Sequence, residues 1–525
     1  MISDGVKDCV AEDYPEYLRD ESRKVGRADS LSFPQTEDEL KTLVKELNLS
    51  GTRFTVQGAR TGITGGSVPD GGCIINVSRM NRILGMHHGR AGESFVLTVQ
   101  PGVLLVELNA AIRSGEFDTV DWSADSLAVL DSFRKAPKYF FPPDPTEDSA
   151  SIGGMVACNA SGAKSLLYGP TRSYVQRLRV VLSDGSVVDL KRGAQFAEGR
   201  VYNVTTTTGV TINGKLPTYK MPDVKNAAGY YVTDNMDLLD LFIGSEGTLG
   251  IITEIDLLIV RLPEERWGVM IFLPTEKAAI NLVERLRSTG AKPASIEFFD
   301  KYALSLLNEQ RRINPAFGAL PEAPDAGRTA IYVEYHDHDT ESVESSVIRL
   351  SEIMLDCGGE EEKAWVFSND REMMRLKQFR HAVPEAVNLL IDARKRIYPE
   401  LTKLGTDLAV PDAGLRNLMD LYDKGLNAAE LKYVKFGHIG NNHIHVNIIP
   451  SDPEEYRRGK EIYMEWARAA VKMGGTVSAE HGIGKLKKTM LLEMYGTDGI
   501  KEMLALKRTF DRKGLLNRGN LFDFV

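Results

Sequence analysis

The alternation of apolar and polar residues predicts a helix near the start of the chain. In residues 34–48 (PQTEDELKTLVKELN), apolar side chains stand at positions 40, 43, 44 and 47, which is the spacing of one helical face. Thr36 can cap the first turn, and Glu39 can complete a capping box with it. We therefore expect a helix that begins after Thr36 and packs its apolar face against a core.

Short apolar runs between glycine-rich segments predict strands in the region that follows. Residues 52–58 and 73–80 are typical of strands and flank a glycine-rich loop, GARTGITGGSVPDGG. Residues 94–103 predict a further strand, and residues 178–190 (LRVVLSDGSVVDL) predict a hairpin. The pattern indicates a mixed α+β protein.

The rhythm changes after RLPEER, at residues 261–266. Residues 266–300 contain a strand, a helix (EKAAINLVERLRS) and a second strand, and residues 329–368 repeat this order. Two such units predict a second domain of the ferredoxin-like kind with an antiparallel sheet.

Composition and charge exclude several classes of protein. The net charge of -9 and the lack of long basic runs argue against a nucleic-acid partner. The four cysteines are far apart and form no CxxC pair, which fits a reducing compartment. The first 23 residues are too charged for a secretory leader, and no run of about 18 apolar residues occurs. We expect a soluble cytoplasmic protein, at most peripheral to a membrane.

Three small-residue stretches indicate where an extended ligand binds. In GARTGITGG a strand, not a helix, follows the glycines, so this is no dinucleotide fingerprint of the Rossmann kind. Successive backbone N–H groups can still hold a diphosphate, although a glycine-rich hairpin explains this loop equally well. Residues 152–169 and 243–250 are similar stretches, and the three together suit a flavin dinucleotide.

Histidines gather near the C-terminus. Four of the nine lie between residues 438 and 481, in GHIGNNHIHVN and SAEHGIGK. A strand over HIHVNII places His443 and His445 on the same face, and the preceding turn brings His438 close. Glu480 adds a carboxylate, so the group suits zinc, manganese or iron. Any one of these histidines alone is more typical of a core or surface residue.

The order of these motifs, VQGARTGITGGSVP, PPDPTEDSASIGGMVACNASG, KNAAGY and IGSEGTLGIITE, resembles the vanillyl-alcohol oxidase / p-cresol methylhydroxylase superfamily. Within it, the chain is similar to the D-lactate, glycolate and D-2-hydroxyglutarate dehydrogenases. The resemblance implies a two-part FAD-binding domain of the p-cresol methylhydroxylase type over residues 1–265. It further implies a ferredoxin-like substrate (cap) domain over residues 266–480, and a segment, 481–525, that returns to the FAD domain.

The resemblance also assigns the cofactor contacts. No histidine stands between residues 58 and 66, where members that tether the flavin often carry one near the place of Thr61, so we expect non-covalent FAD. Arg60 takes a place commonly held by glycine, and LLNRGNLF replaces the more usual LNPGK. The cofactor residues expected by resemblance are Gly58, Ala59, Arg60, Thr61, Gly62, Gly65, Gly66, Pro143, Asp144, Gly153, Gly154, Asn159, Gly162, Tyr168, Glu246, Gly247, Ile251 and Asn517.

Members of this branch show GHxGDGNxH followed by SAEHGxG. By this match His438, His445 and Glu480 are the metal ligands, and His481 is the catalytic base. The chain has NNH in place of DGN, so His443 is a departure, and we leave it outside the ligand set. Arg380, in KQFRHAVPEA, matches an arginine that precedes a helix and holds the substrate carboxylate through its planar fork.

These assignments predict a metal-assisted oxidation of a small 2-hydroxy acid, in which His481 takes the hydroxyl proton and a hydride passes to flavin N5. Gly405 stands where some 2-hydroxyglutarate enzymes carry a lysine, which favours D-lactate, but Lys403 is near. A flavin oxidase that uses oxygen or another alcohol, and a non-catalytic electron-transfer subunit, stay open. The electron acceptor is a quinone, a cytochrome or an electron-transfer flavoprotein, and the sequence leaves a homodimer open.

Overall fold

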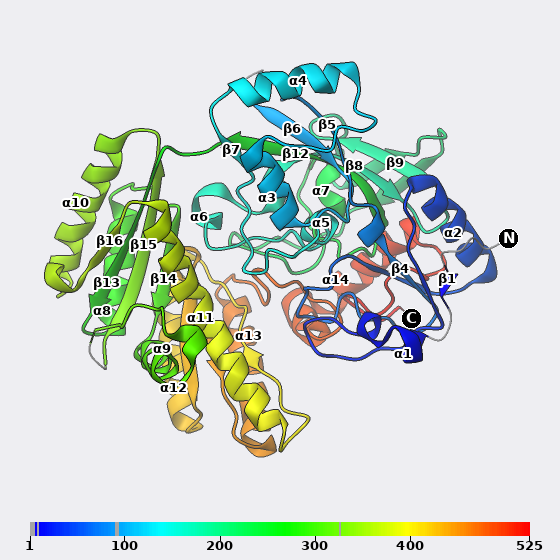
Figure 1. Ribbon diagram of the computed structural model, residues 1–525. Coiled ribbons are helices and arrows are strands. Elements are labelled where there is room, and N and C mark those ends of the chain that lie inside the picture. The colour runs from blue at the N-terminus through cyan, green and yellow to red at the C-terminus, as the bar shows by residue number, and fades with distance from the viewer. Residues whose placement is uncertain (1–5, 8–9, 90–93, 325–326, 525) are drawn as a thin grey trace.

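The computed structural model describes residues 6–7, 10–89, 94–324 and 327–524. Figure 1 shows two halves side by side. The described residues up to Arg261 and the C-terminal helix α14 (Lys488–Phe510) build one half, and the described residues between them build the other. Within the described ranges, no helix is both long and apolar enough to cross a membrane.

The first half begins with a small four-stranded sheet. Helix α2 (Glu37–Ser50) starts as predicted, since the Thr36 side chain accepts a hydrogen bond from Glu39 N and Leu40 is buried. The Glu39 carboxylate accepts from Gln35 N instead of Thr36 N, so the predicted capping box is shifted by one residue. In sheet order, the strands are β1 (Val6–Lys7), β2 (Ser30–Ser32), β4 (Cys73–Asn76) and β3 (Phe54–Gln57).

A larger antiparallel sheet completes this half. The predicted hairpin forms β8 and β9, and the long strand β12 pairs with both β6 and β8. The strands are β5 (Ile83–His88), β6 (Phe95–Val99), β12 (Ile251–Arg261), β8 (Val175–Val181) and β9 (Val187–Lys191), with β7 (Tyr139–Phe140) on β12 and a separate hairpin of β10 (Val201–Thr205) and β11 (Thr211–Lys215). The other helices are α1 (Val10–Asp13), α3 (Leu105–Ser114), α4 (Ala124–Lys135), α5 (Ile152–Cys158), α6 (Ser165–Tyr168) and α7 (Leu239–Phe242).

The second half is built on one seven-stranded sheet whose strand pairs are all antiparallel. Its order is β16-β13-β15-β14-β18-β19-β17, and the first four strands are arranged as in a split βαβ unit, which confirms the ferredoxin-like prediction. These strands are β13 (Glu265–Leu273), β14 (Ser295–Phe299), β15 (Thr329–Asp337) and β16 (Trp365–Phe367). The extension consists of β17 (Leu404–Gly405), β18 (Tyr433–His438) and β19 (His443–Ile448).

Helices cover both faces of this sheet, which explains the continuous apolar run in β13. Val269 and Ile271 pack in the same core as α8 (Glu276–Ser288) and α10 (Thr340–Asp356). Met270 and Phe272 point the other way and share a core with the remaining helices of the unit. Those helices are α9 (Lys301–Ile313) and α11 (Asp370–Lys395), and α12 (Leu415–Ala428) and α13 (Pro453–Lys472) follow along the chain.

The last part of the chain packs on the first half. Helix α14 is broken at Gly496, whose φ of 68° interrupts the helical geometry. Beyond it, Phe54 N donates to Leu515 O, and Asn517 N donates to Phe54 O, both at 2.9 Å. The C-terminal residues therefore lie beside β3, directly before the glycine-rich loop (Figure 1).

Candidate functional site

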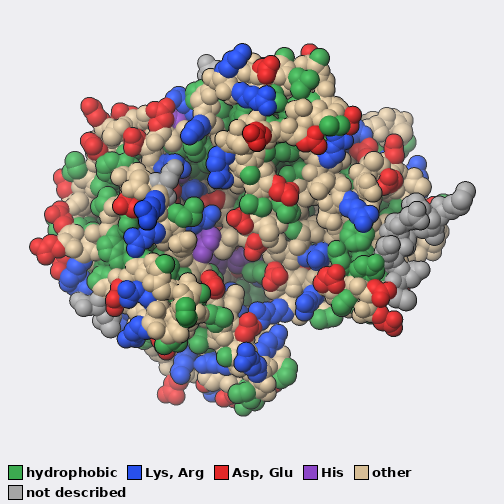
Figure 2. Space-filling model, viewed as in Figure 1, with side chains coloured by type: hydrophobic (Ala, Val, Ile, Leu, Met, Phe, Trp, Pro, Cys, Tyr) green, Lys and Arg blue, Asp and Glu red, His purple; other side chains and the backbone are tan. Residues whose placement is uncertain are grey.

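One face of the second-half sheet carries a row of polar side chains. Residues opposite each other in antiparallel strands lie on the same face, and β18 and β19 pair His438 with His443. Glu297 on β14 and Glu334 on β15 lie on this face as well, because Glu297 is paired with Tyr332, two residues from Glu334. Figure 2 shows histidine side chains recessed between the two halves.

Three histidines and one glutamate form an imidazole–carboxylate cluster, consisting of His438, His443, His445 and Glu480. Each offers one ligand atom, and these atoms all lie within 4.8 Å of one another. His438 Nε2 is 3.3 Å from Glu480 Oε1, and His445 Nε2 is 3.9 Å from Glu480 Oε2. The structure thus brings together the three predicted ligands and adds His443, which the sequence interpretation left outside.

The other ring nitrogens of two cluster histidines have partners of their own. His438 Nδ1 lies 2.7 Å from the buried carboxylate of Glu297, and His445 Nδ1 lies 2.8 Å from the carbonyl oxygen of Thr406. Both partners can accept a hydrogen bond from Nδ1–H, which leaves Nε2 as the ring nitrogen that faces Glu480. This is the arrangement in which proteins present imidazole to a metal ion. His443 Nε2 instead lies 3.0 Å from Asp407 Oδ1.

Burial and neighbouring charges set the protonation of the cluster. Burial lowers the pKa of His443 to about 4, and burial together with the other histidines holds the pKa of His445 well below its usual value. Burial acts in the same direction on His438, but the carboxylates of Glu297 and Glu480 outweigh it and raise its pKa to about 9. Although burial opposes it, His438 and Lys225 hold the pKa of Glu480 well below its usual value.

Asp407 fixes the turn that carries Glu480 and His481. Its fully buried carboxylate accepts hydrogen bonds from the backbone N–H groups of both residues, each at 3.1 Å. The same carboxylate accepts from Ser478 Oγ at 2.6 Å and lies 3.3 Å from His481 Nδ1. This contact can hold the His481 ring in one orientation, with its Nε2 free for a proton transfer.

Arg380 lies on the polar side of the sheet, but its local structure differs from the expectation. It stands inside α11, not before a helix. Pro384 is consistent with the expected helix boundary, because proline has no N–H to bond to the carbonyl four residues earlier. That carbonyl belongs to Arg380. Burial opposes it, yet the carboxylates of Glu297 and Asp144 raise the pKa of Arg380, so the guanidinium stays charged close to the cluster.

The glycine-rich loop packs closely against the second small-residue stretch. Ser151 Oγ accepts hydrogen bonds from Ala59 N at 3.3 Å and from Gly154 N at 3.4 Å. A Cβ atom at Gly58 would lie 2.1 Å from Ser151 Oγ, and one at Gly162 would lie 2.1 Å from the carbonyl oxygen of Asp144. Only glycine allows these backbones to approach so closely.

Two further contacts join these loops to the turn that carries the cluster. Thr64 Oγ1 donates to His481 O at 3.2 Å, while Thr64 O accepts from Lys485 N at 3.0 Å. Ser161 Oγ donates to Glu480 Oε1 at 3.3 Å. Two of the segments expected to hold a flavin therefore touch the segment that carries the expected ligand and base.

The remaining cofactor candidates have definite surroundings. Tyr168 bonds to His336 Nδ1 at 2.8 Å, Asn159 Oδ1 accepts from Arg172 N at 3.0 Å, and Arg60 stacks over the ring of Tyr17. Pro143 is buried, and Asp144 Oδ1 accepts from Lys164 N at 3.3 Å. Thr61 and Gly62 lie in the loop before Gly65 and Gly66, and Gly153 lies in α5.

Glu246 and Asn517 use their side chains on the protein itself. Both Glu246 carboxylate oxygens accept backbone N–H groups, from Ile483 at 2.6 Å and from Gly484 at 2.7 Å. Asn517 accepts from Val56 N at 2.7 Å and donates to Glu246 O at 3.0 Å. These contacts tie the C-terminal segment to the glycine-loop strand. Of the neighbouring candidates, Ile251 is buried and Gly247 is partly exposed.

The structure also brings in residues that sequence reasoning did not single out. Glu297 comes from the strand SIEFFD, where a carboxylate within an apolar run was the available signal, because buried acids are rare unless paired. Lys225 comes from KNAAGY, a quoted motif in which the lysine received no role. Its ammonium contacts Glu480 Oε1 directly.

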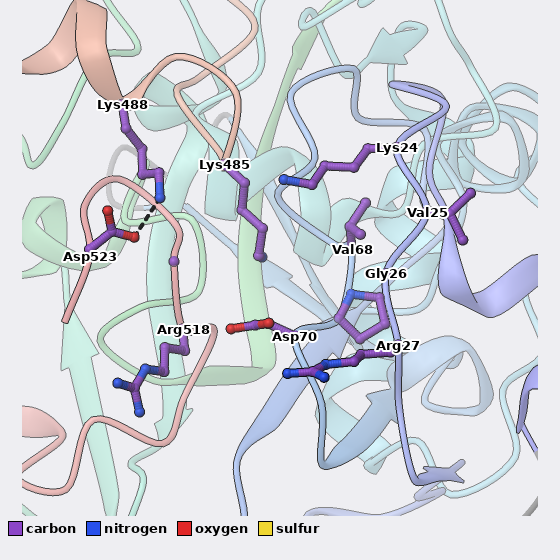
Figure 3. Close-up of a pocket in the computed structure, with 12 residues that line it drawn as sticks. Lys24, Val25, Gly26, Arg27, Val68, Asp70, Lys485, Lys488, Arg518 and Asp523 are labelled. Atoms are coloured by element: carbon purple, nitrogen blue, oxygen red, sulfur yellow. Dashed lines mark hydrogen bonds and ion pairs between the residues drawn. The ribbon is translucent and has the colours of Figure 1, made fainter. Parts of the chain in front are cut away.

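A basic hollow of about 460 Å³ lies on the surface behind the glycine-rich loop (Figure 3). Lys485 connects the two features, because its Nζ lies 3.5 Å from the carbonyl oxygens of Gly65 and Gly66. Asp70 and Asp523 also line it, and Lys488 pairs with Asp523 at 2.5 Å. The cationic side chains around the hollow are those of Lys24, Arg27, Lys485, Lys488 and Arg518.

Two family models match most of the chain. Residues 262–521 match the C-terminal domain of FAD linked oxidases. Residues 28–132 and 126–191 match an FAD binding domain. The models thus cover both halves, including the glycine-rich loop and the imidazole–carboxylate cluster.

Relatives and solved structures are similar along nearly the whole chain. A probable mitochondrial D-lactate dehydrogenase of Danio rerio is 29% identical over 97% of this chain and 88% of its own length. The glycolate oxidase subunit GlcD of Bacillus subtilis is 27% identical over 94% of this chain and 89% of its own. The 4-ethylphenol oxidase of Gulosibacter chungangensis shares the fold, with a TM-score of 0.65, 16% identity, and coverage of 99% of this chain and 94% of that one.

Proposed function

The chain belongs to the FAD-linked oxidases and is an FAD-dependent oxidoreductase acting on CH–OH groups; on that premise we propose that it oxidises a small 2-hydroxy acid to the 2-oxo acid. The observation that carries the proposal is the contact between the cofactor loops and the cluster. Glu480 bonds to Ser161, and the His481 carbonyl bonds to Thr64. A substrate held at the cluster is therefore next to segments that match an FAD binding domain.

The residues present fit both proposed groups. Glycines such as Gly58 and Gly162 let the expected cofactor segments pack closely, so that backbone groups of more than one segment can contact the same extended cofactor. No histidine in residues 58–66 is available for a covalent link. For a divalent cation, His438, His445 and Glu480 supply two imidazole nitrogens and a carboxylate, a donor set suited to zinc, manganese or iron. His443 can serve as a fourth ligand or shape the pocket.

The chain's own residues have separate roles in the proposed reaction. Arg380 holds the substrate carboxylate through two parallel hydrogen bonds, which fixes the α-carbon. His481, oriented by Asp407, accepts the hydroxyl proton at Nε2. A divalent cation at the cluster would supply charge that stabilises the alkoxide, and bound FAD would supply the hydride acceptor.

The substrate we favour is a monocarboxylate resembling D-lactate. Gly405 offers no side chain for a second carboxylate. One observation favours a dicarboxylate as the second candidate. Lys403 Cε lies 3.8 Å from the Cβ position of Gly405, and no ion pair of Lys403 is found among the described residues. Burial, together with the positive charge of Arg23, lowers the pKa of Lys403 to about 8.

We propose that the electron acceptor is a quinone, a cytochrome or an electron-transfer flavoprotein. We also propose that the protein is cytoplasmic. Two alternative functions predict different results. An oxidase would produce peroxide in air, whereas a pure electron-transfer subunit would show no reduction of its flavin by any substrate. An anion-binding arginine beside a proton acceptor is unnecessary in such a subunit, which favours the enzyme.

Anaerobic flavin bleaching tests the proposal. The purified protein is mixed with D- and L-lactate, glycolate and D-2-hydroxyglutarate, and flavin absorbance is followed after each addition. We expect bleaching by one enantiomer of a small 2-hydroxy acid and loss of bleaching after chelation or in His445→Ala, with the bound FAD spectrum preserved. Absence of bleaching by every hydroxy acid in the metal-loaded protein would refute the proposed function.

A further inference from the structure

Lys225 occupies a buried position between the two parts of the proposed site. Its ammonium forms an ion pair with Glu480 Oε1 and donates a hydrogen bond to the carbonyl oxygen of Gly162 at 3.2 Å. The side chains of Lys225 and Glu480 are only 7% and 11% exposed. One nitrogen thus touches both an expected metal ligand and a loop expected to hold the flavin.

The backbone beside Lys225 is fixed by its neighbours. Asn226 Oδ1 accepts a hydrogen bond from Thr476 Oγ1 at 2.5 Å, and Ala227 N donates to Ser478 O at 2.8 Å. Both partners belong to the segment of residues 476–479 that leads into Glu480. The loop and the turn therefore hold each other, and the ammonium can change partners by rotating its side chain alone.

The charges around Glu480 leave Lys225 without a full counter-ion once a cation is bound. Glu480 Oε1 already lies 3.3 Å from both His438 Nε2 and Ser161 Oγ. A divalent cation on Glu480 uses the negative charge that otherwise neutralises the ammonium, and only the Gly162 carbonyl stays as an acceptor. A buried ammonium next to a dication is costly unless an anion joins it.

Lys225 and Arg380 also lie near the same carboxylate. Both attract the buried carboxylate of Glu297 electrostatically, and that carboxylate also contacts His438 Nδ1 at 2.7 Å. Two cations from different halves of the molecule, one on α11 and one on the loop of residues 222–232, thus lie near the cluster. An anionic ligand between them would meet a positive charge on either side.

We propose that Lys225 is a substrate-binding residue of the proposed site, whose ammonium leaves Glu480 when the divalent cation binds and pairs with the carboxylate of the hydroxy acid. The inference rests on the proposed function. It assigns a role to a residue that is neither a ligand of the cation nor the proton acceptor. A charge-assisted hydrogen bond of this kind makes Lys225 a partner of Arg380 in holding the anionic end of the substrate.

Oxalate, a dianion that cannot be oxidised at an α-carbon, tests the proposal without turnover. Oxalate is titrated into the FAD- and metal-loaded protein, and its dissociation constant is read from the flavin absorbance. We expect Lys225→Met to weaken oxalate binding about 10–100-fold, the range for losing one hydrogen bond to a charged group. Lys225→Arg should recover part of the loss. Lys488→Met, which removes a lysine paired with Asp523 at the basic hollow, should bind oxalate like the unaltered protein.

Metal content and a neutral substrate analogue separate this role from others. Lys225→Met should keep its metal. Its loss of binding affinity relative to the unaltered protein should be smaller for the methyl ester of the preferred hydroxy acid, because the ester carries no carboxylate charge. Unchanged oxalate binding, or loss of metal from Lys225→Met, would overturn the inference and leave the proposed function standing. Failure of the unaltered protein to bind oxalate or to be bleached by any hydroxy acid would instead refute the proposed function.

Discussion

Replacement of Glu297 by glutamine tests whether the cluster is a metal site. Glu297 Oε1 lies 2.7 Å from His438 Nδ1, and the two side chains are 2% and 12% exposed. The carboxylate fixes the ring so that Nε2 faces Glu480, and its charge makes that nitrogen a stronger donor. Glutamine keeps the shape but loses the charge and offers an amide that can turn either way.

The expected loss follows from the effect of such partners in other metal proteins. Removing one typically weakens metal binding about 10–100-fold. This corresponds to about 1.4 to 2.8 kcal/mol. Competition with a chromophoric chelator gives the affinity, mass spectrometry gives the metal content, and the flavin spectrum reports whether FAD binding is intact.

Glu334→Gln is the matched control. Glu334 is a buried carboxylate on the same sheet face, also 2.7 Å from an imidazole nitrogen, but that imidazole belongs to His336. It should keep the metal affinity of the unaltered protein. Equal losses in the two variants, or an unchanged affinity in Glu297→Gln, would refute the reasoning.

Four other outcomes are expected. Acid precipitation should release the flavin, and colour left in the washed pellet would indicate a covalent link. His481→Ala should keep its metal but slow flavin reduction about 10²–10⁴-fold in stopped-flow measurements, as expected for a lost general base; loss of metal would assign it to the ligands instead. Arg380→Lys should slow flavin reduction at low substrate concentration far more than it weakens FAD binding, because lysine lacks the planar fork; unchanged kinetics of flavin reduction would place Arg380 outside the site. Burial raises the pKa of Asp300 to about 7. The protonated Asp300 carboxyl therefore contributes to the free energy of unfolding in full below about pH 4, and this contribution is lost as the pH rises through 7. Asp300→Asn keeps a good helix cap, and its melting temperature relative to the unaltered protein should rise from pH 4 to pH 8 in calorimetry.

Local patterns alone predicted the elements that build the site. The period of two in HIHVNII placed His443 and His445 on one face, and their ring centroids are 4.3 Å apart. Two strand–helix–strand units were enough to predict the ferredoxin-like order. Such predictions succeed because side-chain direction and helix starts depend on residues a few positions apart.

Local patterns misled where a single residue has two meanings. Pro384 suggests a helix boundary, but it lies inside α11, since core packing of Val383 before it and Val387 after it stabilises the helix on both sides. The capping box of α2 likewise closes on Gln35, one residue before the predicted partner. In both cases the element was expected, and tertiary contacts decided its limits.

The sequence by itself determined the strands, the helices and the residue types of the site, whereas the partners of those residues depended on the tertiary structure. Glu297 is 141 positions from His438, and Lys225 is 255 positions from Glu480. No periodicity links residues so far apart, because their contact depends on how sheets and loops pack. The tertiary structure alone therefore decided which carboxylate orients His438 and which ammonium lies on Glu480, and the charge balance of the site follows from those two contacts.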